Sequence, residues 1–202
     1  MSRHHVPATL HSPSLARAIK DHVLLLFSLL GIMWAIEIVD LLPFFQSDYY
    51  GIHPRSMSGL PGIVLAPFLH AGFRHLIVNS LPFVVLGGIV LLGGLRVFWR
   101  VTAFVTLVGG LGVWLFAGSW SNHIGASGLI FGYLGFILAR GCFERSLPWM
   151  LIGCAILVGY GGLLLGVLPL NAGVSWQGHL FGLLAGIAAA RLMFPRGRTM
   201  LR

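Results

Sequence analysis

Charged residues are scarce in this chain. Asp, Glu, Lys and Arg make up 9% of its 202 residues, and only five of these are acidic, whereas roughly 25% charged residues is usual in soluble domains. Cysteine is scarce too: Cys142 and Cys154 give neither a zinc-binding spacing nor a disulfide framework, and we expect both to be packing residues. No basic cluster is interleaved with aromatic residues, so the net charge of +8 does not indicate nucleic-acid binding.

Hydrophobic residues, by contrast, make up 57% of the chain and are gathered in long uncharged stretches. A helix of about 20 apolar residues crosses the hydrocarbon core of a membrane, which is roughly 30 Å thick. The pattern therefore predicts an all-α, polytopic membrane protein with six transmembrane helices, of which the fourth and sixth are short for a full crossing. The uncharged stretches lie near residues 23–36, 75–95, 101–122, 125–139, 147–170 and 174–190.

These helices would form a membrane domain, residues 23–194, between an N-terminal segment, 1–22, and a basic tail, 195–202. The first loop, residues 44–74, is long and rich in Pro, Gly and aromatic residues, which indicates a segment lying in the membrane interface. Eleven of the thirteen basic residues fall on one side of the predicted spans. Because cytoplasmic loops carry the excess of Lys and Arg, we expect both termini in the cytoplasm and contact with anionic membrane lipid.

Ser127 and His179 are polar residues inside predicted spans, where such residues are costly and usually functional. Both spans enter the membrane from outside, and Arg140 and Arg191 mark their inner ends. Ser127 precedes Arg140 by 13 residues and His179 precedes Arg191 by 12, which is about 20 Å and about 18 Å of helix. We therefore expect both side chains about 10 Å below the outer surface, in a cavity open to water from outside.

Glycines at four-residue spacing indicate that the fourth and sixth spans touch. Small residues at this spacing let helix backbones approach closely, although packing alone would explain any single pair of them. With equal depth and close helices, we expect the Ser127 hydroxyl within hydrogen-bond distance of the His179 imidazole. The glycines are Gly128 and Gly132 in the fourth span and Gly178, Gly182 and Gly186 in the sixth.

A serine beside a histidine is suited to nucleophilic catalysis, because the imidazole takes the serine proton and later protonates the leaving group. The second span adds His75 and Asn79, four residues apart on one helical face. Together with the backbone N–H of Ser127, these side chains could donate hydrogen bonds to an oxyanion. Gly125 and Gly128 flank the serine and leave room for a substrate backbone.

Other polar residues have simpler interpretations. No acidic residue is aimed at His179, so we expect a dyad, with Glu37 and Asp40 as solvated residues at the outer end of the first span. A metal site formed by His70, His75 and His179 lacks an established ligand spacing, and no metal or other cofactor is expected. The remaining histidines are expected on the surface or in loops: His4, His5, His11, His22, His53 and His123.

The separate elements, in this order and spacing, resemble those of the rhomboid intramembrane serine proteases of the six-helix bacterial type. Residues 125–128 match their GxSG motif, residues 70–79 match HxxxxHxxxN, and residues 179–182 match the base with its following glycine, Gly182. The resemblance implies that Ser127 is the nucleophile and His179 the general base, with an oxyanion hole formed by His75, Asn79 and the Ser127 N–H. By the same resemblance, His70 would support the first loop or the water-access region.

Two positions depart from the family pattern. Many members carry Tyr four residues after the nucleophile, stacked on the base, where this chain has Phe131, which keeps the stacking and loses the hydroxyl. The Trp-Arg pair of the family's first loop is absent, with Pro54-Arg55 nearby instead. The resemblance implies single-span membrane proteins as substrates, cut in or beside the transmembrane segment at small residues. It also implies a bacterial cell membrane location, with the active site opening to the outside.

Two alternatives stay open: a proteolytically silent, rhomboid-like membrane chaperone, and a small transporter. A chaperone would bind membrane helices without needing Ser127. Transporters usually show internal repeats with interrupted spans in matching halves, and no such repeat is evident. Oligomeric state, cleavage-site sequence and any influence of Glu37 or Asp40 on His179 are also left open.

Overall fold

A computed structural model describes residues 15–170 and 173–195 of the chain. The predicted all-helical architecture is confirmed: this part contains helices and one isolated bridge, between Ile52 and His123, and no strand. The α-helices are α1 (Leu15–Val39), α2 (Gly62–Leu65), α3 (Phe73–Leu91), α4 (Leu95–Phe104), α5 (Gly110–Phe116), α6 (Ser127–Glu144), α7 (Leu147–Tyr160) and α8 (Trp176–Met193). Short helical segments are the 3₁₀ helices η1 (Ser47–Tyr50), η2 (Met57–Gly59), η3 (Ala66–Phe68) and η5 (Gly161–Val167), and the π-helix η4 (Val105–Gly109).

Four segments are long and apolar enough to cross a membrane: Leu15–Val39, Phe73–Leu91, Leu95–Phe116 and Leu147–Val167. The third of them runs continuously through α4, η4 and α5. The other two predicted spans coincide with α6 and α8, of 18 residues each, and these are not among the described segments that are long and apolar enough to cross a membrane. The chain is a multi-pass membrane protein, and the two short helices are the ones that carry Ser127 and His179.

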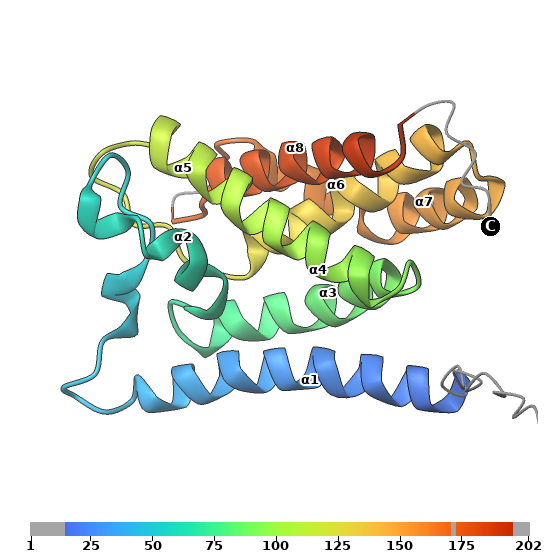
Figure 1. The fold of residues 1–202 in the computed structure, drawn as a ribbon. Coiled ribbons are helices and arrows are strands. Elements are labelled where there is room, and N and C mark those ends of the chain that lie inside the picture. Colours follow the sequence, from blue (N-terminus) through green and yellow to red (C-terminus); the bar gives the residue numbers. More distant parts are fainter. Residues whose placement is uncertain (1–14, 171–172, 196–202) are drawn as a thin grey trace, which may run out of the picture.

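The helix α6 lies at the centre of the bundle, with most of its side chains buried from Leu129 to Ile137. In Figure 1, α8 runs alongside α6, α7 lies at the far end from α2, and α1 packs against α3 on the outside. Most exposed side chains of α3 and α7 are apolar, among them Leu81 and Val158. An apolar exterior of this kind is suited to lipid rather than to water.

Glycines bring α8 into backbone contact with α6, as predicted. A Cβ atom added at Gly182 would lie 2.0 Å from the carbonyl oxygen of Gly128, and one at Gly186 would lie 1.9 Å from that of Gly132. No side chain fits at either position without displacing a backbone. The four-residue spacing therefore sets the distance between the two helices that carry the candidate dyad.

Two details of the sequence-based expectations need correction. The first helix already includes Leu15, before the expected residue 23, because residues 15–22, four of them charged or His, continue the helix beyond its uncharged part. Cys142 and Cys154 are exposed on the bundle exterior and do not pack in its interior. Residues 1–14 and 196–202, with His4, His5, His11 and most of the basic tail, lie outside the described residues.

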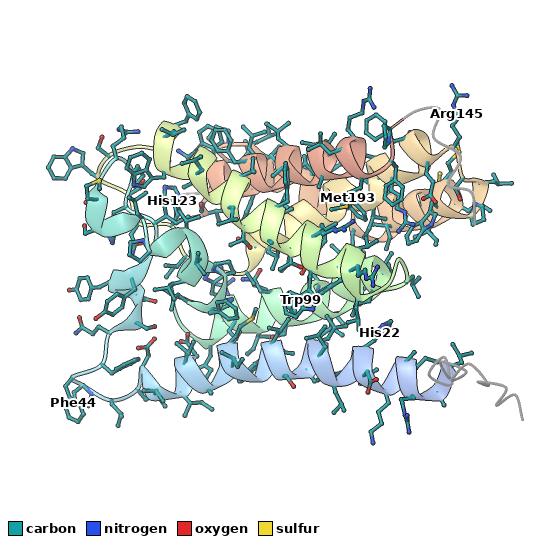
Figure 2. The ribbon with its side chains drawn as sticks, in the orientation of Figure 1. His22, Phe44, Trp99, His123, Arg145 and Met193 are labelled. Atoms are coloured by element: carbon teal, nitrogen blue, oxygen red, sulfur yellow. The ribbon has the colours of Figure 1, made fainter. Side chains whose placement is uncertain are left out.

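The two ends of the bundle differ in character. Phe44, in the first loop, lies at one end of the molecule, whereas Arg145 and Met193 lie toward the other (Figure 2). At the second end, Arg140 is buried between aromatic rings, with its guanidinium carbon 3.6 Å from the Trp149 ring centroid and 4.5 Å from that of Phe194. Its Nε also donates to Glu144 at 2.7 Å. Arg140 thus fixes the inner end of α6 through cation–π contacts and an ion pair.

Candidate active site

Ser127 is the first residue of α6, directly after a loop that glycine allows to turn. Gly125 has a φ of +113°, a conformation that residues with a Cβ rarely adopt. A Cβ at Gly125 would also lie 2.6 Å from Cε1 of His75 and 3.7 Å from Nδ2 of Asn79. The loop before the serine therefore rests directly against the two polar side chains that α3 contributes.

His179 is held on two sides. Its ring stacks on Phe131 of α6, with centroids 4.1 Å apart and planes 6° apart, so the predicted stacking is confirmed. Its Nδ1 lies 2.9 Å from the carbonyl oxygen of Gly166 in η5. Because a carbonyl only accepts hydrogen bonds, Nδ1 carries the proton and Nε2 is left with a free lone pair. The imidazole is thus fixed in the tautomer that a general base needs.

Ser127 and His179 line one cavity of about 1210 Å³, and His75, Asn79 and Phe131 line it with them. The structure therefore brings together, from three helices, the residues singled out by their depth in the sequence. The expected hydrogen bond between the Ser127 hydroxyl and the His179 imidazole is not present in the structure, and within the described residues that hydroxyl has no partner. Catalytic hydrogen bonds are often long without substrate and tighten when it binds.

Three N–H donors surround this cavity near Ser127. The Asn79 side-chain nitrogen Nδ2 is buried and has no hydrogen-bond partner among the described residues. Nδ1 of His75 accepts from the Ala71 N–H at 3.4 Å, so the other ring nitrogen of neutral His75 carries the proton. The N–H of Ser127 opens α6 and has no acceptor within the helix. An unpartnered buried donor is costly, and an anion bound here would relieve that cost.

His70 supports the loop that precedes Ser127. It is buried, and its Nε2 accepts the N–H of Ala126, the residue before Ser127, at 3.3 Å. Burial and the neighbouring His75 lower the pKa of His70 to about 4. The ring therefore stays neutral at physiological pH and keeps the lone pair that holds the loop. Gly125, Gly128 and Gly182 line a smaller cavity on the other side of Ser127.

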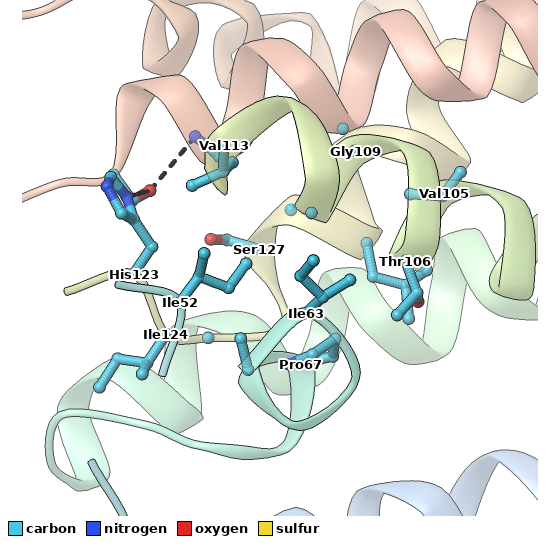
Figure 3. Close-up of a pocket in the computed structure, with 18 residues that line it drawn as sticks. Ile52, Ile63, Pro67, Val105, Thr106, Gly109, Val113, His123, Ile124 and Ser127 are labelled. Carbon is cyan, nitrogen blue, oxygen red and sulfur yellow. Dashed lines mark hydrogen bonds between the residues drawn. The ribbon is translucent and has the colours of Figure 1, made fainter. Parts of the chain in front are cut away.

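That smaller cavity has a volume of about 50 Å³ and largely apolar walls. Figure 3 shows Ser127 between Ile52, Ile63 and Val113, with Thr106 and Val105 farther along the same pocket. Its size suits a small side chain and excludes a large one. The serine thus lies between a wide cavity, which His75, Asn79 and His179 also line, and a narrow pocket.

Nothing in the sequence singles out His123, which lies in a loop, as expected, but is buried, 6% exposed. Its Nδ1 lies 2.6 Å from Oγ of Ser175, and its Nε2 lies 2.8 Å from Oγ of Ser121. Ser121 donates its hydroxyl proton to the Gly118 carbonyl, so Nε2–H of His123 donates to Ser121, and the Ser175 hydroxyl donates to Nδ1. Burial and nearby His53 lower the pKa of His123 to about 4, which keeps this arrangement intact near neutral pH.

Ser175 also begins α8, where its Oγ accepts the N–H of Gly178 at 3.2 Å as an N-cap. His123 is four residues before Ser127, and Ser175 is four residues before His179. The hydrogen bond between His123 and Ser175 therefore links the two chain segments that precede Ser127 and His179. A short polar residue just before an apolar helix was the available sequence signal for Ser175, whereas nothing in the sequence pairs it with His123.

Glu37 also differs from its expected place. It is 5% exposed and is not solvated, because the first loop folds back over the end of α1. Glu37, Asp40 and Asp48 line a separate cavity with His70, and none of them lines the cavity of His179. The candidate base is oriented by the carbonyl of Gly166, in the position where an acid would act in a triad.

Comparison with known proteins shows the family of the chain. The family model of the Rhomboid domain matches residues 58–196. Uncharacterized proteins of Mycobacterium tuberculosis and Mycobacterium leprae are each 43% identical over 176 residues, 83% of this chain and 73% and 70% of theirs. A protein of Bacillus subtilis named as a putative rhomboid protease is 30% identical over 128 residues, 58% of this chain and 59% of its own. The chain belongs to the rhomboid family of membrane proteins.

Proposed function

We propose that this protein is an intramembrane serine endopeptidase that cuts membrane proteins in or beside a transmembrane segment. The observation that carries the proposal is the shared cavity of Ser127 and His179, with the tautomer of His179 fixed by Gly166. A silent chaperone would need the cavity but neither a lone pair aimed into it nor three unpartnered donors around it. A transporter would need a polar path through the bundle, whereas this cavity is lined by residues near one end of α3, α6 and α8.

The proposed reaction begins when an unwound stretch of substrate lies in the cavity. Oγ of Ser127 attacks the carbonyl carbon of the peptide bond as Nε2 of His179 takes the hydroxyl proton. The N–H groups of Asn79, His75 and Ser127 donate to the oxyanion that forms. His179 then returns its proton to the leaving amine, and an acyl-enzyme forms as the C–N bond breaks. Water, deprotonated by His179, hydrolyses the ester and restores the serine.

Gly166 takes part through its backbone alone. Its carbonyl holds Nδ1–H of His179 at 2.9 Å, and this bond becomes charge-assisted when the imidazole takes the second proton. A Cβ at Gly166 would lie 2.9 Å from the Phe131 ring and 3.0 Å from Nδ1 of His179. A glycine here therefore permits both the stacking and the hydrogen bond that orient the base.

The 50 Å³ pocket beside Ser127 supports a small residue next to the cut bond. The substrate class is inferred from the surroundings of the site: the cavity is embedded in an apolar bundle, so the chain reaching it comes from a membrane-embedded segment. The excess of basic residues at the end opposite the first loop supports cytoplasmic termini and an active site open to the outside of the cell membrane.

A covalent serine probe tests the proposal directly. Purified protein in detergent is treated with a fluorophosphonate, digested, and mapped by mass spectrometry, while a single-span model substrate is incubated in parallel. We expect one adduct, on the peptide that contains Ser127, and substrate cleavage that stops as the adduct forms. An adduct on another serine, or substrate binding without either adduct or cleavage, would mean that the protein is not a serine protease.

The His123–Ser175 bond provides a second test, because it sets the spacing between the serine loop and α8. We expect Ser175→Ala to lower the rate of cleavage about 10-fold, since small displacements of catalytic groups are costly, and to destabilise the fold by about 1 kcal/mol through the lost cap. Ser175→Thr keeps both hydrogen bonds and should restore both values. Kinetics at several substrate concentrations should place the loss in kcat rather than in KM.

The companion variant His123→Phe separates the bond from the cap, since it retains a ring and leaves Ser175 free to cap α8. It should show the kcat loss of Ser175→Ala without the full loss of stability. A Ser175→Thr protein as slow as Ser175→Ala, or a His123→Phe protein as fast as wild type, would show that the bond does not position the dyad.

A further inference from the structure

Three of the five acidic residues of the chain meet at one place outside the candidate dyad. Glu37 from the end of α1, Asp40 just after it and Asp48 from η1 line a cavity of about 440 Å³. Such a concentration of carboxylates is unexpected in a chain with a net charge of +8. We call this space the acidic cavity.

Two of the three carboxylates have an oxygen without a partner. Oε2 of Glu37 and Oδ1 of Asp48 are buried and make no hydrogen bond to any described residue. Asp40 differs, because its two oxygens accept from the N–H and the hydroxyl of Ser47. Within the described residues no Lys or Arg pairs with any of the three. Burial and the nearby Asp40 raise the pKa of Asp48, which is the result expected for carboxylates that lack a cation.

Buried charges without partners are costly, so the acidic cavity is suited to a cation from outside the chain. Its size points to an organic cation. No group of three His, Cys, Asp or Glu side chains in the described part of the chain is placed to hold one metal ion. The walls include the aromatic rings of Phe45 and Tyr49, against which the hydrocarbon stem of an ammonium or guanidinium group can pack.

The acidic cavity adjoins the catalytic cavity. Asn122 lines both of them. His70 lines the acidic cavity and accepts, on its Nε2, the N–H of Ala126 beside Ser127. One imidazole ring thus separates the carboxylates from the serine loop. A polypeptide lying against Ser127 could therefore reach the acidic cavity with a long side chain a few residues away.

We propose that the acidic cavity binds a Lys or Arg side chain of the substrate, from the segment that leaves the catalytic cavity on the outer side. The inference rests on the proposed protease function. It makes the cavity a specificity site that selects substrates with a basic residue just outside the transmembrane segment. A lipid ammonium group offers the same chemistry, and the experiment below separates the two sources.

The test uses synthetic single-span peptides that carry one Lys, or the uncharged norleucine, at successive positions in the outer juxtamembrane segment. Cleavage by wild-type protein and binding to Ser127→Ala protein are both measured, in vesicles of phosphatidylglycerol with and without phosphatidylethanolamine. At one position or two adjacent ones, Lys should raise kcat/KM and binding about 10-fold over norleucine. The preference should shrink as salt is added.

The preference should fall to near unity in Asp48→Asn protein and persist in Asp21→Asn protein, which loses the same charge from the exposed part of α1. Using the Lys-to-norleucine ratio cancels any change in folding or overall rate. Equal ratios at every position, or a preference that survives Asp48→Asn, would overturn the proposal. A Lys preference that is lost only when phosphatidylethanolamine is present would show that lipid fills the cavity, and would also overturn the proposal. A preference lost in millimolar Ca²⁺ but not in matched NaCl would show that Ca²⁺ fills it, with the same consequence.

Measuring both cleavage by wild-type protein and binding to Ser127→Ala protein keeps this proposal distinct from the protease function. Lys-dependent binding to Ser127→Ala protein with no cleavage by wild type would support cation binding in the acidic cavity and reject the protease function. Cleavage without any Lys preference would retain the protease and reject the site.

Discussion

Peptide cleavage is expected to fall by about 10⁴-fold or more in Ser127→Ala and in His179→Ala proteins that remain folded. The physical reason is that neither group acts alone. Without the hydroxyl there is no nucleophile, and without the imidazole the hydroxyl keeps its proton. Two other histidines, His75 and His123, line the cavity, but the lone pair of each ring already accepts a hydrogen bond, from Ala71 and from Ser175. The measurement is kcat/KM on a single-span model substrate, with unfolding followed on the same samples.

The double variant makes this prediction more specific. Because the two residues act as a unit, Ser127→Ala with His179→Ala should be no slower than either single variant. Ser28→Ala and His22→Ala, both in α1 and outside the linings of the three cavities described above, make the same chemical changes and should cleave as wild type does. Losses that multiply in the double variant would show that the residues act independently, and the dyad would be wrong.

Much of the site could be predicted from the sequence because depth and order are one-dimensional properties of a membrane helix. Counting residues from Arg140 and Arg191 predicts that Ser127 and His179 lie level, and glycine spacing predicts that their helices touch. These two predictions need helix geometry only. The stacking of Phe131 on His179 is instead what the resemblance to the family implies, and the structure shows it.

The rest depends on how loops fold, and a helical pattern says little about that. The Gly166 carbonyl has no sequence signal, because any residue carries a carbonyl. The bond of His123 to Ser175 joins positions 52 residues apart, and burial of Glu37 needs the first loop to fold over α1. Cys154 lies in a helix that is apolar on all sides, so its exposed face could not be told from its packed one. The scarcity of charged residues thus predicts the membrane bundle, whereas the few polar contacts made by its loops, which complete the site, could not be predicted.

The second large effect is expected at the glycines where α8 meets α6. A methyl group at Gly186 would lie 1.9 Å from the Gly132 carbonyl oxygen, and one at Gly182 would lie 2.0 Å from that of Gly128. Neither neighbour is a flexible side chain, so a helix must move. Overpacking typically costs 1–3 kcal/mol, and contact with rigid backbone places Gly186→Ala at about 3 kcal/mol of destabilisation or more.

Gly159→Ala in α7 is the matched control, because a Cβ there meets nothing within 4 Å. Replacing an unconstrained helical glycine by alanine should leave stability unchanged or raise it by up to about 1 kcal/mol. Unfolding in detergent can be followed by the fluorescence of the six Trp residues, at one heating rate for all variants since such unfolding is often irreversible. Equal midpoints for Gly186→Ala and Gly159→Ala would show that α6 and α8 are not in backbone contact.

Gly182→Ala should lower both the stability and the rate of cleavage, because Gly182 lies one turn after His179 and faces the carbonyl of Gly128, the residue after Ser127. Moving α8 outward there would separate the imidazole from the hydroxyl by about the displacement itself, and about 1 Å of misplacement costs on the order of 100-fold in rate. Cleavage at a temperature where the variant is still folded should therefore fall about 100-fold. A Gly182→Ala protein that is less stable yet cleaves at the wild-type rate would mean that the α6–α8 contact holds the bundle together without setting the geometry of the dyad.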